Sequence, residues 1–445
     1  MTKLGDFKGE LSGYAKVVGS GYIESMKKAA EESGAKRVFM VNATKNGGGV
    51  AILMNSIVPI MNNLRIETHW LELKANPEFF NVTKSFHNGL QGEKFDNIDD
   101  KIEEYKRFYE EDFQKYNEEI MGFLDSLGKG DMVVIHDPQP LGMIDYRKDD
   151  GSTWIWRCHI DSSHPDEKLW NFVEDLAKKY DKRIVSKDEF KHGDLDWEII
   201  PPSIDPTILM NKDIDDDVAD DIIEILGVPR DKPMITQVSR FDKWKDPVGV
   251  VEVFSRVRKD VDCSLVLVYN GASDDPEGDM MYKKVSESIE KCEYSDDIHL
   301  VRGDRQTIVN VFQRASDVVL QKSLREGFAL TVSEALWKAS PVVATKVGGI
   351  PLQVIDGFNG YLVEPYDYGV NDERRESHIG EVASKVASIL LDEEKAKELG
   401  ENAKEYVRKN FLITRQVMDY LELFKKLKVR MEEAPEIEVS QESSV

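Results

Sequence analysis

Two acidic residues, Glu326 and Glu334, stand eight positions apart where a short apolar run gives way to an expected helix. The run at 317–321 (DVVLQ) is typical of a buried strand in a parallel sheet, because apolar residues bounded by polar ones mark such strands. Either Thr331 or Ser333 is expected to cap the helix that follows. The turn between strand and helix therefore lies at the carboxyl edge of a sheet, where open α/β folds bind ligands.

This turn suits sugar-nucleotide binding, since the free amides in the first turn of a helix favour an anion. The alternative is that both glutamates are solvated residues that the helix dipole favours at a helix start. The two glutamates alone do not separate these interpretations.

Basic side chains follow an expected strand near the middle of the chain. Arg240 and Lys245 lie five positions apart there and could bind a diphosphate, because a guanidinium matches planar phosphate oxygens and an ammonium acts as a point charge. The alternative pairs Lys243 and Lys245 with Asp242 and Asp246 on the surface, where ion pairs stabilise little.

Two expected strands in the first half of the chain end in histidine and aspartate. His159 and Asp161 lie on the same side of the backbone by the two-residue period of a strand, and they could contact sugar hydroxyls. His136 and Asp137 end another strand and could orient an acceptor. The alternative is that each histidine is a structural group with its hydrogen bonds satisfied.

Three consecutive glycines, Gly47 to Gly49, follow the first expected strand and precede an apolar helical run at 51–61. Glycines let the backbone approach a ligand closely, and the helix start behind them favours a phosphate. The spacing matches neither the dinucleotide fingerprint nor the P-loop. A plain tight turn is the alternative.

Composition excludes several classes of function. The net charge of −24, from 83 acidic and 59 basic residues, makes nucleic acid or an anionic membrane an unfavourable partner. No run of 18 apolar residues and no signal-peptide core occurs, so we expect a cytoplasmic protein. The three cysteines and eight histidines lack ligand spacing, which predicts neither a disulfide framework nor a metal site.

Apolar runs alternate with helical stretches along the chain, which predicts an α/β fold with doubly wound parallel sheets. A segment with three prolines at 199–206 separates two sets of strands. A charged helix at 99–119 is expected to cover the first sheet. The expected strands are 37–41, 66–71, 132–136, 154–158 and 183–185 in the first set, and 234–238, 265–268, 298–301, 318–320 and 342–344 in the second.

Taken together, these motifs resemble the retaining glycosyltransferases of family 4, which have two facing Rossmann-like domains around a cleft, the GT-B architecture. Three blocks, at 78–88, 154–161 and 274–278, look closer to one branch of that family, the trehalose glycosyltransferring synthases. The likeness covers about residues 14 to 428.

The resemblance implies an acceptor-side domain at 1–205 and a nucleotide-sugar domain at 206–408. A helix at 409–428, with apolar residues at helical spacing, is expected to join the first domain. The end of the chain, 431–445, is acidic and carries no aromatic residue, so we expect a disordered tail.

The implied reaction makes trehalose from a nucleoside-diphosphate glucose and free glucose, reversibly and with retention of the α configuration. The resemblance implies no required cofactor, Mg²⁺ as a stimulant, and a homodimer as a compatible assembly. A trehalose phosphorylase, or another retaining glucosyltransferase with a different acceptor, is the alternative. A non-catalytic sugar-nucleotide sensor is a third interpretation.

The resemblance also implies roles on the donor side. Arg240 and Lys245 would bind the diphosphate, and Glu334 would bind the ribose. The remaining donor-binding positions would be Glu326 with the backbone of Gly327, Phe328, Ala329 and Leu330, then Thr331, and Gly48 and Gly49 from the facing domain.

On the acceptor side, His159 and Asp161 would face the reacting sugars. His136, Asp137 and Gln139 would line the acceptor pocket. The stretches at 270–273 and 302–306 differ from the family pattern around the nucleobase, so base preference stays open.

Overall fold

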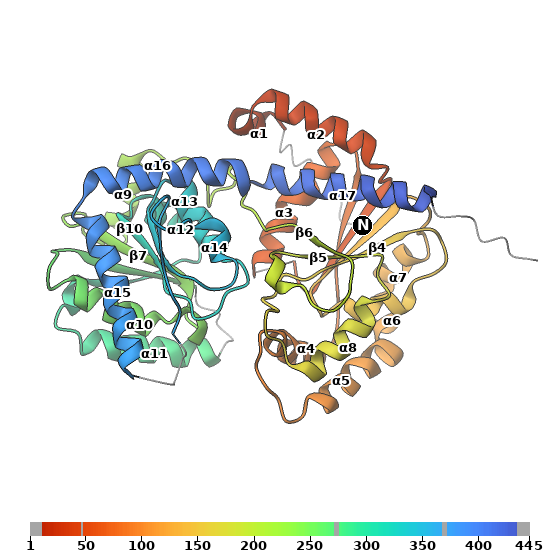
Figure 1. Ribbon diagram of the computed structural model, residues 1–445, viewed down its shortest axis with the longest axis horizontal. Helices are drawn as coiled ribbons and strands as arrows, with labels where there is room; N and C mark the ends of the chain where they lie inside the picture. The colour runs from red at the N-terminus through yellow and green to blue at the C-terminus, as the bar shows by residue number, and fades with distance from the viewer. Residues whose placement is uncertain (1–10, 46–47, 271–275, 367–371, 434–445) are drawn as a thin grey trace, which may run out of the picture.

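The computed structural model describes residues 11–45, 48–270, 276–366 and 372–433. Each half of the chain forms a parallel sheet with helices on both faces, and the two halves lie side by side in Figure 1. The strand order is β2-β1-β3-β4-β5-β6 in the first sheet and β12-β11-β10-β7-β8-β9 in the second. The prediction of doubly wound α/β domains is therefore confirmed.

All ten predicted strands are present, within a few residues of the expected bounds. In the first sheet they are β1 (Arg37–Asn42), β2 (Glu67–Glu72), β3 (Asp131–His136), β4 (Thr153–Arg157) and β5 (Lys182–Val185). In the second they are β7 (Met234–Arg240), β8 (Ser264–Asn270), β9 (Ile298–Arg302), β10 (Val318–Gln321) and β11 (Val342–Thr345).

Two edge strands, β6 (Trp197–Ile199) and β12 (Tyr361–Val363), were not predicted. Each has only three residues and is half-buried at best along most of its length. They therefore lack the apolar run that marks the central strands.

The helices of the first half pack on both faces of its sheet. They are α1 (Leu11–Val18), α2 (Ser20–Ser33), α3 (Gly48–Asn63), α4 (Pro77–Leu90), α5 (Ile98–Arg107), α6 (Phe113–Tyr116), α7 (Glu118–Leu124) and α8 (Glu167–Ala177), with short turns η1 (Phe108–Asp112), η2 (Leu141–Tyr146) and η3 (Asp188–Phe190). The single helix predicted at 99–119 is wrong in detail, because a π-turn and a break at Asn117 divide it. The Asn117 side chain bonds both backbone groups of Lys74, at 2.8 Å each.

The second half carries α9 (Asp216–Ile225), α10 (Pro247–Val257), α11 (Pro276–Glu290), α12 (Gln306–Arg314), α13 (Leu330–Trp337), α14 (Ile350–Gln353), α15 (Asp372–Leu390) and α16 (Glu393–Asn410), with turns η4 (Lys243–Lys245) and η5 (Ser295–Asp297). The chain then returns to the first half as α17 (Ile413–Glu433), and Figure 1 shows α16 along one lobe and α17 along the other.

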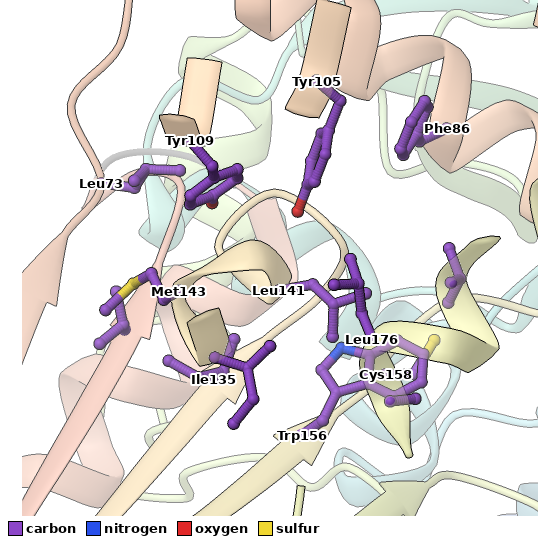
Figure 2. Close-up of a cluster of buried hydrophobic side chains, with 14 of the residues drawn as sticks. Leu73, Phe86, Tyr105, Tyr109, Ile135, Leu141, Met143, Trp156, Cys158 and Leu176 are labelled. Carbon is purple, nitrogen blue, oxygen red and sulfur yellow. The ribbon is translucent and has the colours of Figure 1, made fainter. Parts of the chain in front are cut away.

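The side chains of successive residues in the central strands pack into two different cores, because side chains alternate between the two faces of a sheet. Ile135 and Trp156 point to the face covered by α4, α5 and α8, where Figure 2 shows them below Tyr105 and Tyr109. Val134 and Ile155 belong to the opposite core. Both faces being apolar explains why these strands read as continuous apolar runs.

The helix α17 fills part of that opposite core. Its Leu421 and Phe424 are fully buried with Met26 of α2 and Ile57 of α3. The Ile204 amide donates to the Phe411 carbonyl, and the Ile413 amide donates to the Ile204 carbonyl, both at 2.8 Å. These two bonds hold the crossing segment against the start of α17. The part of the predicted tail at 434–445 lies outside the described residues. Within the described residues, no helix is long and apolar enough to span a membrane.

Candidate active site

The turn between β10 and α13 holds the first glutamate of the pair. The helix begins after Ala329, which has a left-handed backbone with φ of 68° and makes no side-chain cap. Thr331 and Ser333 instead bond the side chains of Gln321 and Gln353, at 3.1 and 2.6 Å. The predicted Thr331 or Ser333 cap is therefore wrong, because the left-handed Ala329 starts the helix two to four residues earlier than either cap would.

A glycine turn braces this segment from below. The amide of Gly349 donates to the carbonyl of Gly327 at 3.1 Å. A Cβ on Gly348, whose φ is 51°, would lie 1.5 Å from the carbonyl oxygen of Glu326, so only glycine fits that position.

Glu326 and Lys245 form an ion pair across the carboxyl edge of the second sheet. Their side chains are 13% and 15% exposed, so the pair lies near the surface of the edge without being freely solvated. Ser323 Oγ donates to the same carboxylate oxygen at 3.2 Å. Glu326 is therefore oriented by two neighbours, and Lys245 presents a positive charge beside it.

The loop that carries Lys245 is tightly held. Asp242 Oδ1 accepts the amides of Trp244 and Lys245 at 2.9 and 3.2 Å, which starts the short turn η4. The carbonyl of Lys245 accepts Gln237 Nε2 at 2.9 Å. Hydrogen bonds thus fix the Lys245 backbone at both its amide and its carbonyl, and its side chain pairs with Glu326.

Arg240 is held more loosely. Its side chain is 71% exposed, and its guanidinium lies 2.9 Å from Asp242. Burial lowers the pKa of His87 to about 4, and the positive charges of Arg240 and Lys84 add to that shift. Because His87 belongs to α4, Arg240 lies close enough to the first half of the chain to act on it.

The alternative of plain surface pairs joined Lys243 and Lys245 to Asp242 and Asp246. The structure instead pairs Lys245 with Glu326 and Asp242 with Arg240, so that alternative is wrong for Lys245.

The two halves meet at the donor turn. A Cβ on Gly327 would lie 2.8 Å from the carbonyl oxygen of His159, so a side chain here would push the halves apart. Nearby, Arg325 donates to the carbonyl of Gln91 in the first half, and its guanidinium carbon lies 4.9 Å from the ring centre of Trp244. This cation–π contact ties the Arg325 bridge to the Lys245 loop.

The predicted glycine loop reaches the same place. Gly48 has φ of 76° and begins α3, and a Cβ on Gly49 would lie 3.3 Å from Leu330 Cδ1. The start of α3 therefore faces the start of α13. Residues 46 and 47 lie outside the described part of the chain.

The acceptor-side residues form a buried polar cluster at the end of β3 and β4. His136 Nδ1 lies 3.0 Å from His159 Nε2, and Asp137 Oδ1 accepts the His159 amide at 2.7 Å. Asp137 has a left-handed backbone with φ of 66°. Burial raises the pKa of Asp137 to about 6 and lowers that of His136 to about 3, with the charge of Arg157 adding to the histidine shift.

Burial also pushes the pKa of His159 well below its ordinary value. Both histidines are therefore neutral at pH 7, and one ring nitrogen of the close pair donates to the other. Such a pair can hydrogen-bond a sugar hydroxyl without adding charge.

Two further acceptor-side residues are engaged locally. Asp161 Oδ1 accepts the amide and hydroxyl of Ser163, at 3.1 and 2.6 Å. The carbonyl of Gln139 accepts the Tyr109 hydroxyl at 2.5 Å. Its residue is only half-buried.

Glu334 lies deeper than expected for a solvated helix residue. It is 3% exposed, one turn inside α13, with Gln313 Nε2 at 3.5 Å. Burial raises its pKa, and the ammonium of Lys338 opposes that shift. The interpretation of Glu334 as a solvated helix-start residue is therefore wrong. Phe328 and Ala329, in the turn before the helix, are buried as well.

Four residues around this cleft were not predicted: His87, Trp244, Lys322 and Arg325. Their contacts join segments far apart in the chain, so no local pattern marks them. Among the described residues, no group of three or more histidine, cysteine or acidic side chains could hold a metal ion.

Comparisons with known proteins agree with this geometry. A family model described as the N-terminal domain of trehalose synthase matches residues 40–192, and one described as glycosyl transferases group 1 matches residues 218–406. The chain is 39% identical over 427 residues to the trehalose synthase of Thermococcus litoralis, covering 95% of this chain and 98% of that protein.

A trehalose phosphorylase of Pleurotus pulmonarius is more distant, with 29% identity over 405 residues that cover 80% of this chain and 54% of that protein. Among solved structures, the UDP-forming α,α-trehalose-phosphate synthase of Burkholderia vietnamiensis aligns with a TM-score of 0.65 and 14% identity, over 90% of this chain and 99% of that one. That likeness shows the same arrangement of two facing domains.

Proposed function

Because the chain belongs to the trehalose synthase family of GT-B glycosyltransferases, we propose that it transfers glucose from a nucleoside-diphosphate glucose to free glucose and so makes trehalose. The observation that carries the proposal is the meeting of Gly327 with the His159 carbonyl, because it brings the donor turn against the acceptor cluster. A sugar bound at Glu326 would then lie next to one bound at His159.

The donor half supplies positive charge to the leaving group. Lys245 and Arg240 would neutralise the diphosphate as its bond to glucose breaks, an interaction that strengthens in the transition state. Lys245 would contribute more, because its backbone is fixed while Arg240 is largely exposed. Glu326 and the backbone from Gly327 to Leu330 would hold the hydroxyls of the donor glucose.

The deeper donor residues would bind the nucleoside. Glu334 and Thr331, at the start of α13, would accept hydrogen bonds from the ribose and donate to it. Gly48 and Gly49 would approach the phosphates from the facing domain. The buried position of Glu334 requires the ribose to reach into the first turn of the helix.

The acceptor half supplies neutral hydrogen-bonding groups. His136, His159 and Asp137 would orient the glucose hydroxyl that attacks, with Asp161 and Gln139 at the rim. Uncharged imidazoles suit this task because glucose carries no charge, and because a cation here would oppose the positive charge that develops on the donor sugar.

Retention follows from attack on the same face that the diphosphate leaves. The bond between the anomeric carbon and the phosphate oxygen breaks while the bond to the acceptor oxygen forms, and the departing phosphate oxygen takes the acceptor proton. The carboxylate of Glu326 is paired with Lys245, which makes it a poor nucleophile. A glucosyl adduct trapped on any carboxylate with a fluorinated donor would refute this mechanism.

The deciding assay incubates the protein with UDP-, ADP- or GDP-glucose and glucose, then measures trehalose and released diphosphate. We expect both products in equal amounts, and glucose release from trehalose when a nucleoside diphosphate is added instead. Trehalose cleavage that requires inorganic phosphate would identify a phosphorylase, and tight donor binding without turnover would identify a sensor. Because Lys245 and Arg240 already supply cations, EDTA should lower the rate without abolishing it.

A further inference from the structure

A second lysine of the donor half, Lys322, has no role in the proposed reaction. It follows β10 directly, and none of its side chain is exposed. Its ammonium pairs with Asp246 Oδ2, and the Tyr366 hydroxyl donates to the same oxygen at 3.1 Å. The ammonium also lies 5.0 Å from the centre of the Tyr366 ring. Lys322 thus sits in a closed polar cluster around one carboxylate.

Asp246 is the residue that immediately follows Lys245. Its backbone is left-handed, with φ of 45° and ψ of 51°, which costs a non-glycine residue about 1 kcal/mol. Its other oxygen, Oδ1, caps α10 by accepting the Gly249 amide at 3.1 Å. The surroundings must hold this strained residue in place, and the ammonium of Lys322 is the charged group that pairs directly with it, with the charge of Arg375 also close enough to act on it.

The Lys322–Asp246 pair is closely packed against the backbone of α10. A Cβ on Gly249 would lie 2.3 Å from Asp246 Oδ2 and 2.7 Å from Lys322 Nζ. Gln237 and Asp242 bond the carbonyl and the amide of Lys245 itself. The loop is therefore held both at Lys245 and at the next residue, Asp246.

We propose that Lys322 is a positioning residue, which acts through Asp246 to aim the Lys245 ammonium at the donor diphosphate. The inference rests on the proposed function, because it assigns Lys245 to the diphosphate. Folding alone does not require a charge here, since apolar residues of similar volume often stabilise a core as well as a buried ion pair. A fixed direction for the neighbouring ammonium does require it.

The main test compares Lys322→Met with Lys182→Met. Lys182 is a matched control, because its side chain is 6% exposed and pairs with Asp196 at 2.5 Å on the first sheet. We measure the affinity for UDP, ADP and GDP and for their parent nucleosides, together with kcat. Lys322→Met should weaken diphosphate binding about tenfold and change nucleoside binding less than about twofold. Lys182→Met should lower only the unfolding midpoint.

A double-mutant cycle with Asp246→Asn tests whether the pair acts as a unit. The double variant should bind the diphosphate no worse than either single variant, since each removes the same interaction. Additive losses would overturn the proposal. Tyr366→Phe covers the case in which Lys322→Met does not fold, and it should weaken diphosphate binding by roughly two- to threefold, the loss expected for one hydrogen bond.

The outcomes separate the two proposals. A wild-type protein that binds no nucleoside diphosphate ends the proposed function and this inference together. A wild-type protein that binds and turns over, with unchanged diphosphate affinity in both Lys322→Met and Tyr366→Phe, ends only the role of Lys322.

Discussion

The two sheets carry different chemistry at the edges that face one another. At the first sheet, His136 is buried and His159 half-buried, and both are neutral and hydrogen-bonded to each other. At the second, Lys245 and Glu326 are charged, paired and partly exposed. The difference teaches that each edge matches a different partner: an uncharged sugar needs direction, and a diphosphate needs compensating charge. Removing charge should therefore damage the donor edge far more than the acceptor edge.

The sharpest way to break this comparison is Lys245→Ala. The change removes the cation and leaves the Glu326 carboxylate unpaired beside the phosphate, so we expect kcat to fall about 10³-fold. The matched control is Lys243→Ala, two positions before Lys245. The ammonium of Lys243 lies 4.7 Å from the centre of the Trp244 ring. The control should retain at least about a third of wild-type turnover, as expected for an exposed cation–π contact. Similar losses in both would show that the total positive charge of the loop matters and that the position of Lys245 does not.

Arg240→Ala tests how much the second cation of the donor edge contributes. Its guanidinium is 71% exposed, so solvent screens it more than Lys245, and we expect kcat to fall about 10²-fold. Binding of the nucleoside should survive. Unchanged turnover would remove Arg240 from the donor site and leave the Asp242 pair as its only role.

Gly327→Ala tests whether the two edges must touch. The new Cβ would meet the His159 carbonyl at 2.8 Å, so the halves must separate slightly and the sugars lose their alignment. We expect kcat/KM to fall roughly 30-fold, because small misplacements are costly to aligned reactants. Gly122→Ala is the control, since nothing lies within 4 Å of a Cβ there. A fully active Gly327→Ala would mean that the two halves are further apart during catalysis.

The sequence predicted the separate parts of this cleft better than their assembly. The ten central strands and the loops that follow them were readable because apolar runs and polar turns are local signals. The same signals predicted a diphosphate contact for Lys245 and a sugar contact for His159, and both roles stay predictions. The short edge strands β6 and β12 carry no such signal.

What the sequence could not predict is which residues meet across long separations. The bridge from Arg325 to Gln91, the pair of Lys322 with Asp246 and the effect of Arg240 on His87 each join distant segments. The helix cap failed for a local reason, because the left-handed backbone of Ala329 does not follow from its residue type. The loop at 270–273 lies mostly, and the block at 274–278 partly, outside the described residues.

The smallest expected effect concerns His87, a neutral group of the first half whose pKa responds to the charge of Arg240 at the donor edge. Burial, with Arg240 and Lys84 adding to it, lowers its pKa to about 4 from an ordinary 6.5. The unfolded chain therefore binds a proton between these two pH values while the folded chain does not. His87 should therefore lower the free energy of unfolding by about 2 kcal/mol as pH falls from 6.5 to 5, in addition to the fall that His136 and His159 cause in the same window.

His87→Gln should remove this dependence, which denaturant unfolding at several pH values would measure as a flatter slope than wild type. His164→Gln, at an exposed position, should keep the wild-type slope. A bound nucleoside diphosphate would offset the charge of Arg240, so it should also reduce the slope in wild type and not in Arg240→Ala. Equal slopes with and without diphosphate would show that Arg240 does not affect the pKa of His87, and that the two edges do not influence each other through charge.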